Sequence, residues 1–330
     1  MASLIVMGAG LIGLRHIETI KAHPNCKLAG VIEPDKSRHT DADISYFTSI
    51  DDVDVEVDGA IIATPTFLHK DNGIDAAKRG WHMLIEKPVT ATPEDAITLS
   101  EAVDAAGLHC LVGHHRRQHP AIHKLRDIVQ NGTIGTVVTS SLIWAMRKPD
   151  DYFQDNWRST DGSPVMINLI HDIDLMRFVL GEIDDIQAIA GNSLRDGGRV
   201  ESGAILMRMA SGLTATISFA DTTPSPWGFE AGTNENPHIA ESFQDMWWIT
   251  GTKGAVSFPS LTLWTGASHW GEAPVPTKID VPSVTPLLQQ ITHFLAVMAG
   301  DEQPLITISD AAASLAATHK IEQLLAAQIR

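Results

Sequence analysis

The chain contains only two cysteines, Cys26 and Cys110, and both lie in apolar segments that are predicted to be strands or strand edges. Two isolated cysteines cannot build a disulfide framework, and this scarcity is typical of a reducing compartment. Long apolar runs are also missing. The first residues, MASLIVMGAG, carry no basic leader, and their apolar run is far shorter than the roughly 20 residues of a membrane-spanning helix. We therefore expect a cytoplasmic protein with no membrane anchor.

Basic residues are scarce relative to acidic ones. The chain has 24 Lys and Arg against 40 Asp and Glu, for a formal net charge of -16. Such a charge repels phosphate backbones and anionic membrane surfaces, so we expect no nucleic-acid partner. Charged residues make up 19% and hydrophobic residues 44% of the 330 residues, as in a folded globular protein long enough for two domains.

The N-terminal part alternates short aliphatic runs with longer segments of helical period, the pattern of parallel strands with crossover helices. The expected strands are Leu4–Met7, Lys27–Ile32, Gly59–Ala63, His82–Ile85 and His109–Val112. The expected helices are Leu11–Ala22, Leu68–Arg79 and Pro93–Ala106, the last with Thr92 as its N-cap. We predict an N-terminal Rossmann domain with a doubly wound parallel sheet at residues 1–118.

After Gly113 the runs become longer and alternate, with Gly-, Pro- and Asn-rich turns between them, which indicates a largely antiparallel sheet. The expected strands are Thr136–Trp144, Gly203–Met209, Leu213–Phe219 and Met246–Thr250. Helices expected to cover one face of this sheet are Pro120–Gln130, Ile170–Leu180, Leu287–Met298 and Asp310–Ala327. Residues 119–330 are therefore predicted to form an α/β domain with a large, open, mostly antiparallel sheet. The stretch Thr222–His238 reads as a long loop, a candidate lid or interface element.

A glycine motif between the first strand and the first helix predicts a dinucleotide site, formed by Gly8, Gly10, Leu11, Ile12 and Gly13. Such glycines permit a tight turn, close approach to a pyrophosphate and close packing of helix on strand. Glu33 ends the second strand 20 residues beyond Gly13, where a carboxylate accepts hydrogen bonds from the adenosine ribose. This acid favours NAD, while the nearby Lys36 and Arg38 leave NADP open.

Two later strands end in residues suited to the same crevice, because ligands of doubly wound sheets bind at the carboxyl ends of the strands. Thr64 and Pro65 follow the third strand and are a candidate cofactor contact, although they also read as an ordinary turn. Glu86 and Lys87 end the fourth strand, before Pro88. Lysine can donate to the oxygen of a secondary alcohol or ketone. The alternative interpretation of Glu86 and Lys87 is a surface ion pair.

The motifs GAGLIG, TPTFLH, EKP and GHHRRQHP, in this order, resemble those of the Gfo/Idh/MocA oxidoreductases over nearly the whole chain. The resemblance implies a Rossmann domain joined to a substrate domain that forms homodimers or homotetramers through its open sheet. It also implies that Lys87 is the catalytic lysine, that the nicotinamide lies beside it, and that His69 of the TPTFLH motif and Glu86 belong to the cofactor site.

A second candidate catalytic residue is His171, which shares a predicted helix face with Asp174. A histidine can exchange a proton near neutral pH, although a lone histidine on a helix is more often a core or capping residue. The family resemblance implies a proton-transfer role for His171, or for Lys87 with the roles exchanged. The family usually has Asp or Asn four residues before this histidine; here that residue is Ile167, and Asn168 follows as a candidate substrate contact.

Further candidate substrate contacts are His115, Arg116, Trp157 and Arg158, because an arginine fork and a flat aromatic ring suit a polyhydroxylated ring or a carboxylate. Each of them could equally be an interdomain or packing residue. Histidines recur at 115, 119 and 123, but Pro120 predicts a helix start between them, so we expect no metal. A zinc alcohol dehydrogenase is disfavoured by the two lone cysteines, and the Tyr-x-x-x-Lys dyad of short-chain dehydrogenases is absent.

The sequence therefore predicts an enzyme that moves a hydride between a nicotinamide and a secondary alcohol or ketone of a small polyhydroxylated substrate: a sugar, a sugar acid, a cyclitol or a cyclic diol. Two other classes stay open. One is a glycoside hydrolase of similar fold that uses NAD transiently, and the other is a non-catalytic regulator that senses the dinucleotide.

Overall fold

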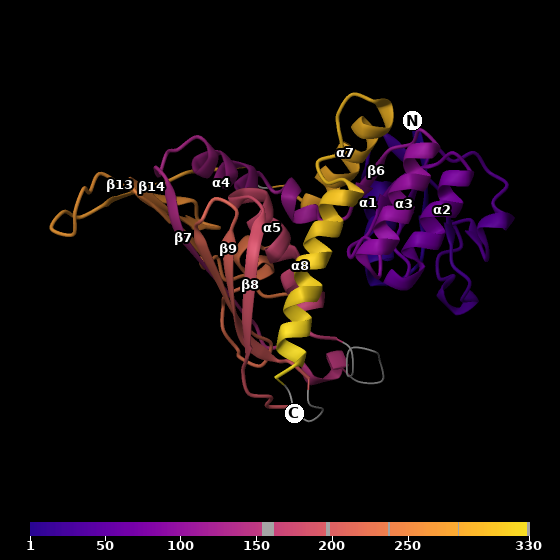
Figure 1. The fold of residues 1–330 in the computed structure, drawn as a ribbon. Coiled ribbons are helices and arrows are strands. Elements are labelled where there is room, and N and C mark those ends of the chain that lie inside the picture. Colours follow the sequence, from indigo (N-terminus) through magenta and orange to yellow (C-terminus); the bar gives the residue numbers. More distant parts are fainter. Residues whose placement is uncertain (154–161, 196–198, 237, 283, 329–330) are drawn as a thin grey trace. The chain divides into compact units, whose positions relative to one another are not determined.

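In the computed structural model (Figure 1), the N-terminal residues form a six-stranded sheet. Its strand order is β3-β2-β1-β4-β5-β6. Every neighbouring pair of these strands is parallel. The strands are β1 (Ala2–Met7), β2 (Cys26–Ile32), β3 (Tyr46–Phe47), β4 (Gly59–Ile62), β5 (His82–Ile85) and β6 (Cys110–Val112). This order reverses direction between β1 and β4, the switch point at which doubly wound sheets bind ligands.

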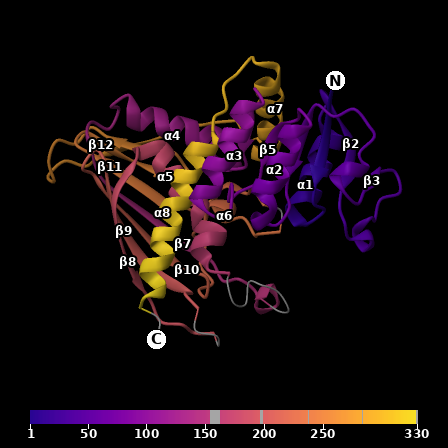
Figure 2. The same ribbon diagram turned by 45° about the vertical axis from the view of Figure 1, so that its right-hand side comes forward.

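The helices of this sheet lie where the sequence pattern predicts them. They are α1 (Leu11–Ala22), α2 (His69–Lys78) and α3 (Pro93–Ala105), which carry the indigo to purple colours of Figure 2. The Thr92 side chain accepts a hydrogen bond from the backbone N–H of Asp95 at 3.2 Å, as expected of an N-cap followed by Pro93. Short 3-10 turns complete the connections: η1 (Lys36–Arg38), η2 (Ile50–Asp52), η3 (Thr66–Leu68) and η4 (His115–Gln118).

Two helices from the end of the chain were expected to cover the antiparallel sheet, and for α7 (Pro286–Ala299) this expectation was wrong. The first unit consists of Met1–Gln118 together with Val284–Ala316, so α7 and the beginning of α8 (Ile308–Ala326) belong to it. Helix α7 packs on α1 and η4, where Leu287, Ile291 and Phe294 are buried. The apolar face of α7 was visible in the sequence, but its partner surface was not.

The second unit, His119–Ser283 with Ala317–Arg330, is built on an eight-stranded sheet in the order β14-β13-β12-β11-β7-β10-β9-β8. Strands β7 and β10 pair in parallel and all other neighbours are antiparallel. The strands are β7 (Val137–Ala145), β8 (Ile183–Ala190), β9 (Ser202–Met209), β10 (Thr214–Ala220), β11 (Trp247–Gly251), β12 (Gly254–Phe258), β13 (Thr262–Thr265) and β14 (Val275–Lys278).

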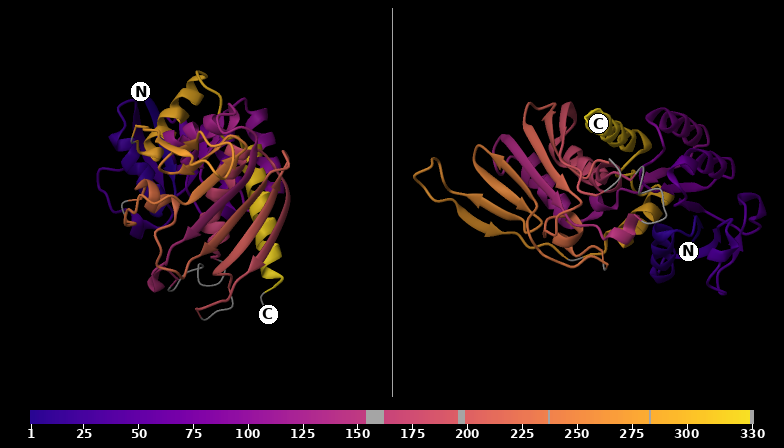
Figure 3. Two further views of the ribbon diagram at one scale, coloured as in Figure 1. Left: turned by 90° about the vertical axis from the view of Figure 1, so that its left-hand side faces the viewer. Right: turned by 90° about the horizontal axis from the view of Figure 1, so that it is seen from below.

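Among the described residues, helices cover one face of this sheet and none covers the other. Helices α4 (Pro120–Gln130), α5 (Ile170–Leu180) and the end of α8 lie on one side of the strands, and the left panel of Figure 3 looks onto the opposite, open side. Strands β9 and β10 accordingly alternate between buried and more exposed residues. The mostly antiparallel open sheet predicted from the sequence is confirmed.

The stretch predicted to be one long loop contains a short helix, α6 (Phe229–Thr233), so this expectation was wrong in part. The helix forms because the Phe229 side chain is fully buried and stacks on Phe258 at 5.5 Å between ring centroids. The glycines and prolines around it belong to the flanking turns. Because they dominate the composition of the stretch, the sequence pattern predicted a loop and gave no weight to the single buried Phe229. Strand β7 also bridges to the stretch at Ala145 and Trp227.

The structure describes residues 1–153, 162–195, 199–236, 238–282 and 284–328, and the two units are treated separately below. Within these residues, no helix is both long enough and apolar enough to cross a lipid bilayer.

The return of α7 to the first unit can be tested by truncating its buried aromatic ring. Phe294 is fully buried and lies against Gly59 of β4. We expect Phe294→Ala to lower the free energy of unfolding by about 3–5 kcal/mol, because a large cavity is left in a packed interface. Urea denaturation monitored by circular dichroism measures the change.

The matched control is Phe243→Ala, because the Phe243 side chain is 62% exposed. That variant should stay within about 0.5 kcal/mol of the parent protein. Equal stability of the two variants would contradict the packing of α7 on the parallel sheet.

Candidate functional site

The glycine turn between β1 and α1 has the geometry of a pyrophosphate cradle. Gly8 has a φ of +97°, a backbone conformation that residues with a side chain rarely adopt. A Cβ on Gly13 would lie 2.0 Å from the Gly8 carbonyl oxygen. A Cβ on Gly10, in contrast, would meet no atom within 4 Å. The third glycine thus permits close packing, while the second leaves open space beside the start of α1. Gly10 also caps α1 without a side-chain hydrogen bond, so the first amides of α1 face a site suited to an anion.

The Glu33 carboxylate lies directly beside this turn. It is 6% exposed and accepts hydrogen bonds from the backbone N–H groups of Ala9 at 2.8 Å and of Asp35 at 3.0 Å. The backbone of β2 therefore delivers an acid to the carboxyl edge, as expected for a ribose-binding residue. Nη1 of Arg38 lies 3.9 Å from Oε2 of Glu33, and Nε of Arg38 lies 3.5 Å from Oδ2 of Asp35. This cation is therefore close to two carboxylates.

His69, an expected cofactor contact, is placed between two of the loops at the same edge. Its ring nitrogens lie 2.8 Å from the carbonyl oxygens of Thr64 and Pro88, and the side chain is 1% exposed. Burial lowers the pKa of His69, although the two carbonyls and the charge of Glu86 oppose this effect. The imidazole thus joins the loop after β4 to the loop after β5. Thr64 also donates its hydroxyl to Asn72 at 2.8 Å.

Glu86 is not part of a surface ion pair but is buried, at 4% exposure. Its Oε1 lies 2.7 Å from Nε2 of His16 on α1, and its Oε2 accepts a 3.2 Å hydrogen bond from the backbone N–H of Lys87. A Cβ on Gly113 would lie 2.9 Å from the same carboxylate, so a glycine is needed beside it. The side chain of Lys87 follows at the end of β5 and is half-buried.

The ionisation of Glu86 is set by its neighbours rather than by its burial. Burial raises the pKa of this carboxyl, but the hydrogen bond and charge of His16, and then the charges of His115 and Lys87, outweigh it and lower the pKa to about 2. Glu86 is therefore a carboxylate at any physiological pH. A buried carboxylate held by two donors is a fixed negative charge at the base of Lys87.

His115 and Arg116, expected substrate contacts, lie in η4 after β6 and are 7% and 2% exposed. This turn packs on α7, and the neighbouring Arg117 donates to Asp310 at 2.5 Å. The charge of His115 contributes to the low pKa of the Glu86 carboxyl. Within the first unit, the structure thus brings together the glycine turn, Glu33, Thr64, Glu86, Lys87 and His115 along one edge of the parallel sheet.

His171 and Asn168 belong to the second unit. His171 lies in the first turn of α5 and is 6% exposed, and Asp172 and Asp174 beside it are 0% and 1% exposed. Asn168 belongs to η7 (Val165–Leu169), a π-helical turn that leads into α5, and its Oδ1 is buried without a hydrogen-bond partner among the described residues. Such π turns are frequent at functional sites. The other two expected contacts, Trp157 and Arg158, lie outside the residues that the structure describes.

Lys148 of the second unit is a chemically unusual residue that the sequence did not single out. It is 9% exposed, and its amine lies 5.6 Å from the ring centroid of Trp144 and 5.1 Å from that of Tyr152. Burial lowers the pKa of Lys148 to about 8; the charges of Arg199 and Arg195 act in the same direction, and those of Asp221 and Glu230 oppose it. A lysine that follows an apolar strand reads as a surface residue, so no sequence signal marked it.

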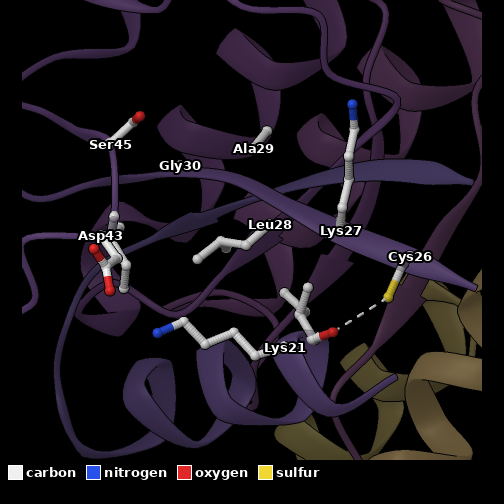
Figure 4. A pocket seen from close by; sticks show the side chains of 10 residues that line it. Lys21, Cys26, Lys27, Leu28, Ala29, Gly30, Asp43 and Ser45 are labelled. Atoms are coloured by element: carbon white, nitrogen blue, oxygen red, sulfur yellow. Dashed lines mark hydrogen bonds between the residues drawn. The ribbon is translucent and has the colours of Figure 1, made fainter. Parts of the chain in front are cut away.

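A cavity of about 330 Å³ in the first unit is not the nucleotide site (Figure 4). It is lined by the end of α1 and by the beginning of β2, including Lys21, Cys26 and Leu28. The strands are parallel, so this cavity lies at the amino edge of the sheet, opposite the glycine turn. Across the described residues no group of three His, Cys, Asp or Glu side chains is arranged to hold a metal ion.

Comparison with known families assigns both parts of the chain to the same group. Residues 3–114 match a family model described as an oxidoreductase family with an NAD-binding Rossmann fold. Residues 122–257 match the model of the GFO/IDH/MocA C-terminal domain. The N-terminal unit is therefore an NAD-binding Rossmann domain, in agreement with its strand order and its glycine turn.

Three curated relatives are 27% to 30% identical to this chain over the aligned residues. The uncharacterized oxidoreductase YrbE of Bacillus subtilis (strain 168) is 30% identical over 224 residues, 64% of this chain and 65% of that protein. The rhizopine catabolism protein MocA of Rhizobium meliloti is 30% identical over 183 residues, which are 54% and 56% of the two chains. Inositol 2-dehydrogenase of Rhizobium meliloti (strain 1021) is 27% identical over 225 residues, or 64% and 67%. The matches thus span about half to two thirds of these relatives.

Solved structures share the fold over almost the whole chain. An oxidoreductase from Agrobacterium radiobacter, solved with NAD+, L-tartaric acid and magnesium, has a TM-score of 0.81 at 15% identity, with 99% of this chain and 96% of that chain covered. UDP-N-acetylglucosamine 3-dehydrogenase GnnA from Acidithiobacillus ferrooxidans has a TM-score of 0.78 at 23% identity, with 99% of both chains covered.

The buried amine of Lys148 predicts an unusual dependence of stability on pH. Its pKa is lower in the folded chain, at about 8, than the ordinary value of 10.5, so the folded state binds the proton less tightly than the unfolded state. Below pH 8 this difference costs on the order of 3 kcal/mol; the cost shrinks as the pH rises from 8 to 10.5 and is absent above that range. Lys148→Met should therefore raise the free energy of unfolding at pH 7, with a gain that vanishes near pH 10.5.

Urea denaturation of both proteins between pH 7 and pH 10.5 measures this difference. The control is Arg147→Met, which removes the adjacent but 53% exposed cation and should change stability little at any of these pH values. A Lys148→Met variant that is less stable than the parent at pH 7 would show that the ammonium is favourably solvated in the folded chain.

Proposed function

Since the chain belongs to the Gfo/Idh/MocA family of oxidoreductases, we propose that it is an NAD-dependent dehydrogenase. It moves a hydride between the nicotinamide and a secondary alcohol or ketone of a sugar, sugar acid, cyclitol or cyclic diol. The observation that carries the proposal is the end of β5, where the buried Glu86 holds the peptide of Lys87 at the ligand-binding edge of a sheet in the Rossmann strand order. The relatives named as inositol dehydrogenases support a polyhydroxylated substrate.

Each first-unit residue of the proposed site has a task that its local geometry permits. The amides at the start of α1, with the open space at Gly10, bind the pyrophosphate, and Glu33 accepts hydrogen bonds from the adenosine ribose. The bound nicotinamide supplies the hydride acceptor or donor. The Lys87 ammonium donates a hydrogen bond to the reacting oxygen of the substrate, where negative charge develops. The family resemblance implies that His171 of the second unit takes or returns the hydroxyl proton, or that Lys87 does so with the two roles exchanged.

The neighbourhood of Glu33 supports NAD rather than NADP. A 2'-phosphate would lie beside the carboxylates of Glu33 and Asp35, and its attraction to Arg38 would compete with both of them. If Arg38 turned from these carboxylates to the phosphate, its attraction to both opposite charges would be lost, which costs free energy. Binding of the unphosphorylated ribose needs no such rearrangement.

The relatives also include a protein that is not named for a redox reaction, the 2,7-anhydro-N-acetylneuraminate hydratase of Escherichia coli (strain K12). A redox-neutral reaction with transient use of NAD, as in a glycoside hydrolase of similar fold, is therefore the second candidate. Substrate consumption without accumulation of NADH distinguishes it from a dehydrogenase. A regulator that only senses the dinucleotide would show NAD binding without any turnover.

The open face of the antiparallel sheet supports assembly into dimers or tetramers. No described helix covers this face, and it exposes apolar side chains, with Leu206 at 44% and Ile189 at 68% exposure. Exposed apolar groups on the open face of a large sheet are typical of a surface that a second copy covers. We propose that this face is the subunit interface.

The role of Lys87 is tested by supplying NAD with a panel of polyols, sugars, sugar acids and cyclic diols and recording NADH formation. We expect turnover of at least one class, and a loss in Lys87→Ala of about a hundredfold or more in kcat, because the donor to the reacting oxygen is removed. The matched control is Lys78→Ala, a 70% exposed lysine on α2 whose loss should leave kcat unchanged. Full activity of Lys87→Ala would remove this amine from the mechanism.

The role of Glu33 is tested by the preference between the two coenzymes. Glu33→Ala should lower kcat/KM for NAD by about 10- to 100-fold, the effect of a lost hydrogen bond to a charged group, and should lower it less for NADP. The ratio of kcat/KM values for NAD and NADP is measured in the parent, in Glu33→Ala and in Glu56→Ala, an exposed acid on the same unit. An unchanged ratio in Glu33→Ala would exclude contact between Glu33 and the ribose.

A further inference from the structure

The His16–Glu86 pair links two elements that are far apart in the sequence. His16 lies in the interior of α1 and is fully buried, and Glu86 follows β5. The 2.7 Å distance between Nε2 of His16 and Oε1 of Glu86 joins the helix that begins at the glycine turn to the strand that ends at Lys87. No charged group of this kind is needed to pack a helix on a parallel sheet, where apolar side chains suffice.

The pair is also an inefficient way to stabilise the fold. Taking two ionisable groups out of water costs several kcal/mol, and a matched apolar pair is often equally stable or more stable. A buried pair of ionisable groups therefore calls for a reason besides stability. Here the remaining carboxylate oxygen supplies one, because it accepts the hydrogen bond from the backbone N–H of Lys87 at 3.2 Å.

The surroundings closely confine the Glu86 side chain. Its backbone N–H is bonded to the Ile62 carbonyl at 2.9 Å, and Gly113 lies against its side chain, where even a methyl group would clash at 2.9 Å. The position of His16 thus sets the position of the carboxylate, and the carboxylate sets that of the Lys87 peptide. His16 lies five residues into α1, so it moves with the amides that face the pyrophosphate site.

We propose that His16 is a positioning residue: through the Glu86 carboxylate it fixes the peptide of Lys87 and couples the dinucleotide-binding end of α1 to the reactive amine. The inference rests on the proposed function for the role of Lys87. Binding of a dinucleotide at the start of α1 restrains His16, and the chain of two hydrogen bonds passes this restraint to the end of β5.

Kinetics separate positioning from simple structural support. In His16→Leu we expect kcat to fall about 10- to 100-fold, while KM for NAD changes less than about threefold, because the nucleotide contacts themselves are intact. His16→Gln places an amide N–H near the former Nε2 and should recover kcat to within about threefold of the parent. The matched control is His23→Leu, at the other end of α1, which removes a buried histidine bonded to the Thr292 hydroxyl and to the Asn25 backbone N–H and should leave kcat unchanged.

The single leucine variant leaves a buried carboxylate without its partner and can fail to fold. The double variant His16→Leu, Glu86→Leu removes the unpaired charge and replaces the pair by two apolar side chains. We expect the melting temperature of the double variant to return to that of the parent while kcat stays about 10- to 100-fold low. A double variant with both normal stability and normal kcat would overturn the proposal and leave the pair a packing element.

Hydrogen–deuterium exchange tests the coupling without any enzymatic activity. In the parent, NAD should slow exchange of the peptides that span residues 84–92. In the double variant NAD should slow exchange at α1 as before but at residues 84–92 by clearly less, because only direct contact with the nicotinamide remains there. This result would support the coupling even if no substrate of the panel were turned over, so it separates failure of the inference from failure of the proposed function. Equal protection of residues 84–92 by NAD in both proteins would overturn the inference.

Discussion

The carboxyl edge of the parallel sheet depends on one buried negative charge, the Glu86 carboxylate. Its burial alone would favour the neutral acid, and the donors around it reverse that preference. His16 on α1 bonds to this carboxylate, and His69 on α2 bonds to the backbone carbonyl of Pro88, two residues further along the chain. Both helices thus hold the end of β5 by polar contacts, whereas the strands below them are held by apolar packing. A charge that cannot move gives the edge a fixed geometry.

Elements with one buried and one exposed face, or with two buried faces, were predictable from the sequence. The strands β1, β4 and β5 are continuous aliphatic runs, and α1, α4 and α5 begin and end as predicted because capping residues, prolines and glycines mark them. Strands at the far edge of the large sheet were not predicted. Every residue of β14 is exposed, and β13 has no fully buried residue, so neither carries the alternation that signals a strand. Their pairing comes from the hairpin between them.

Candidate site residues that belong to a sequence motif could be identified from the sequence. Contacts between residues far apart in the chain could not. The glycine turn, Glu33 and Lys87 are marked by their spacing from strand ends. The partner of Glu86 is 70 residues away in the chain, and a histidine inside an amphipathic helix reads as a core residue. The low pKa of Glu86 likewise follows from groups that only folding brings together. A dipeptide such as Glu86–Lys87 therefore reveals its place at a strand end but not whether its charges are solvated.

The return of Val284–Ala316 to the first unit has a consequence for biosynthesis. The ribosome completes all six parallel strands long before it reaches α7, so the surface around Gly59 stays uncovered while the second unit is being translated. During that interval the nascent chain exposes an apolar surface that a chaperone can recognise. The nucleotide-binding unit therefore reaches its final packing only near the end of elongation. Because the unit consists of two separate segments, it cannot be transferred to another protein as one continuous stretch of sequence.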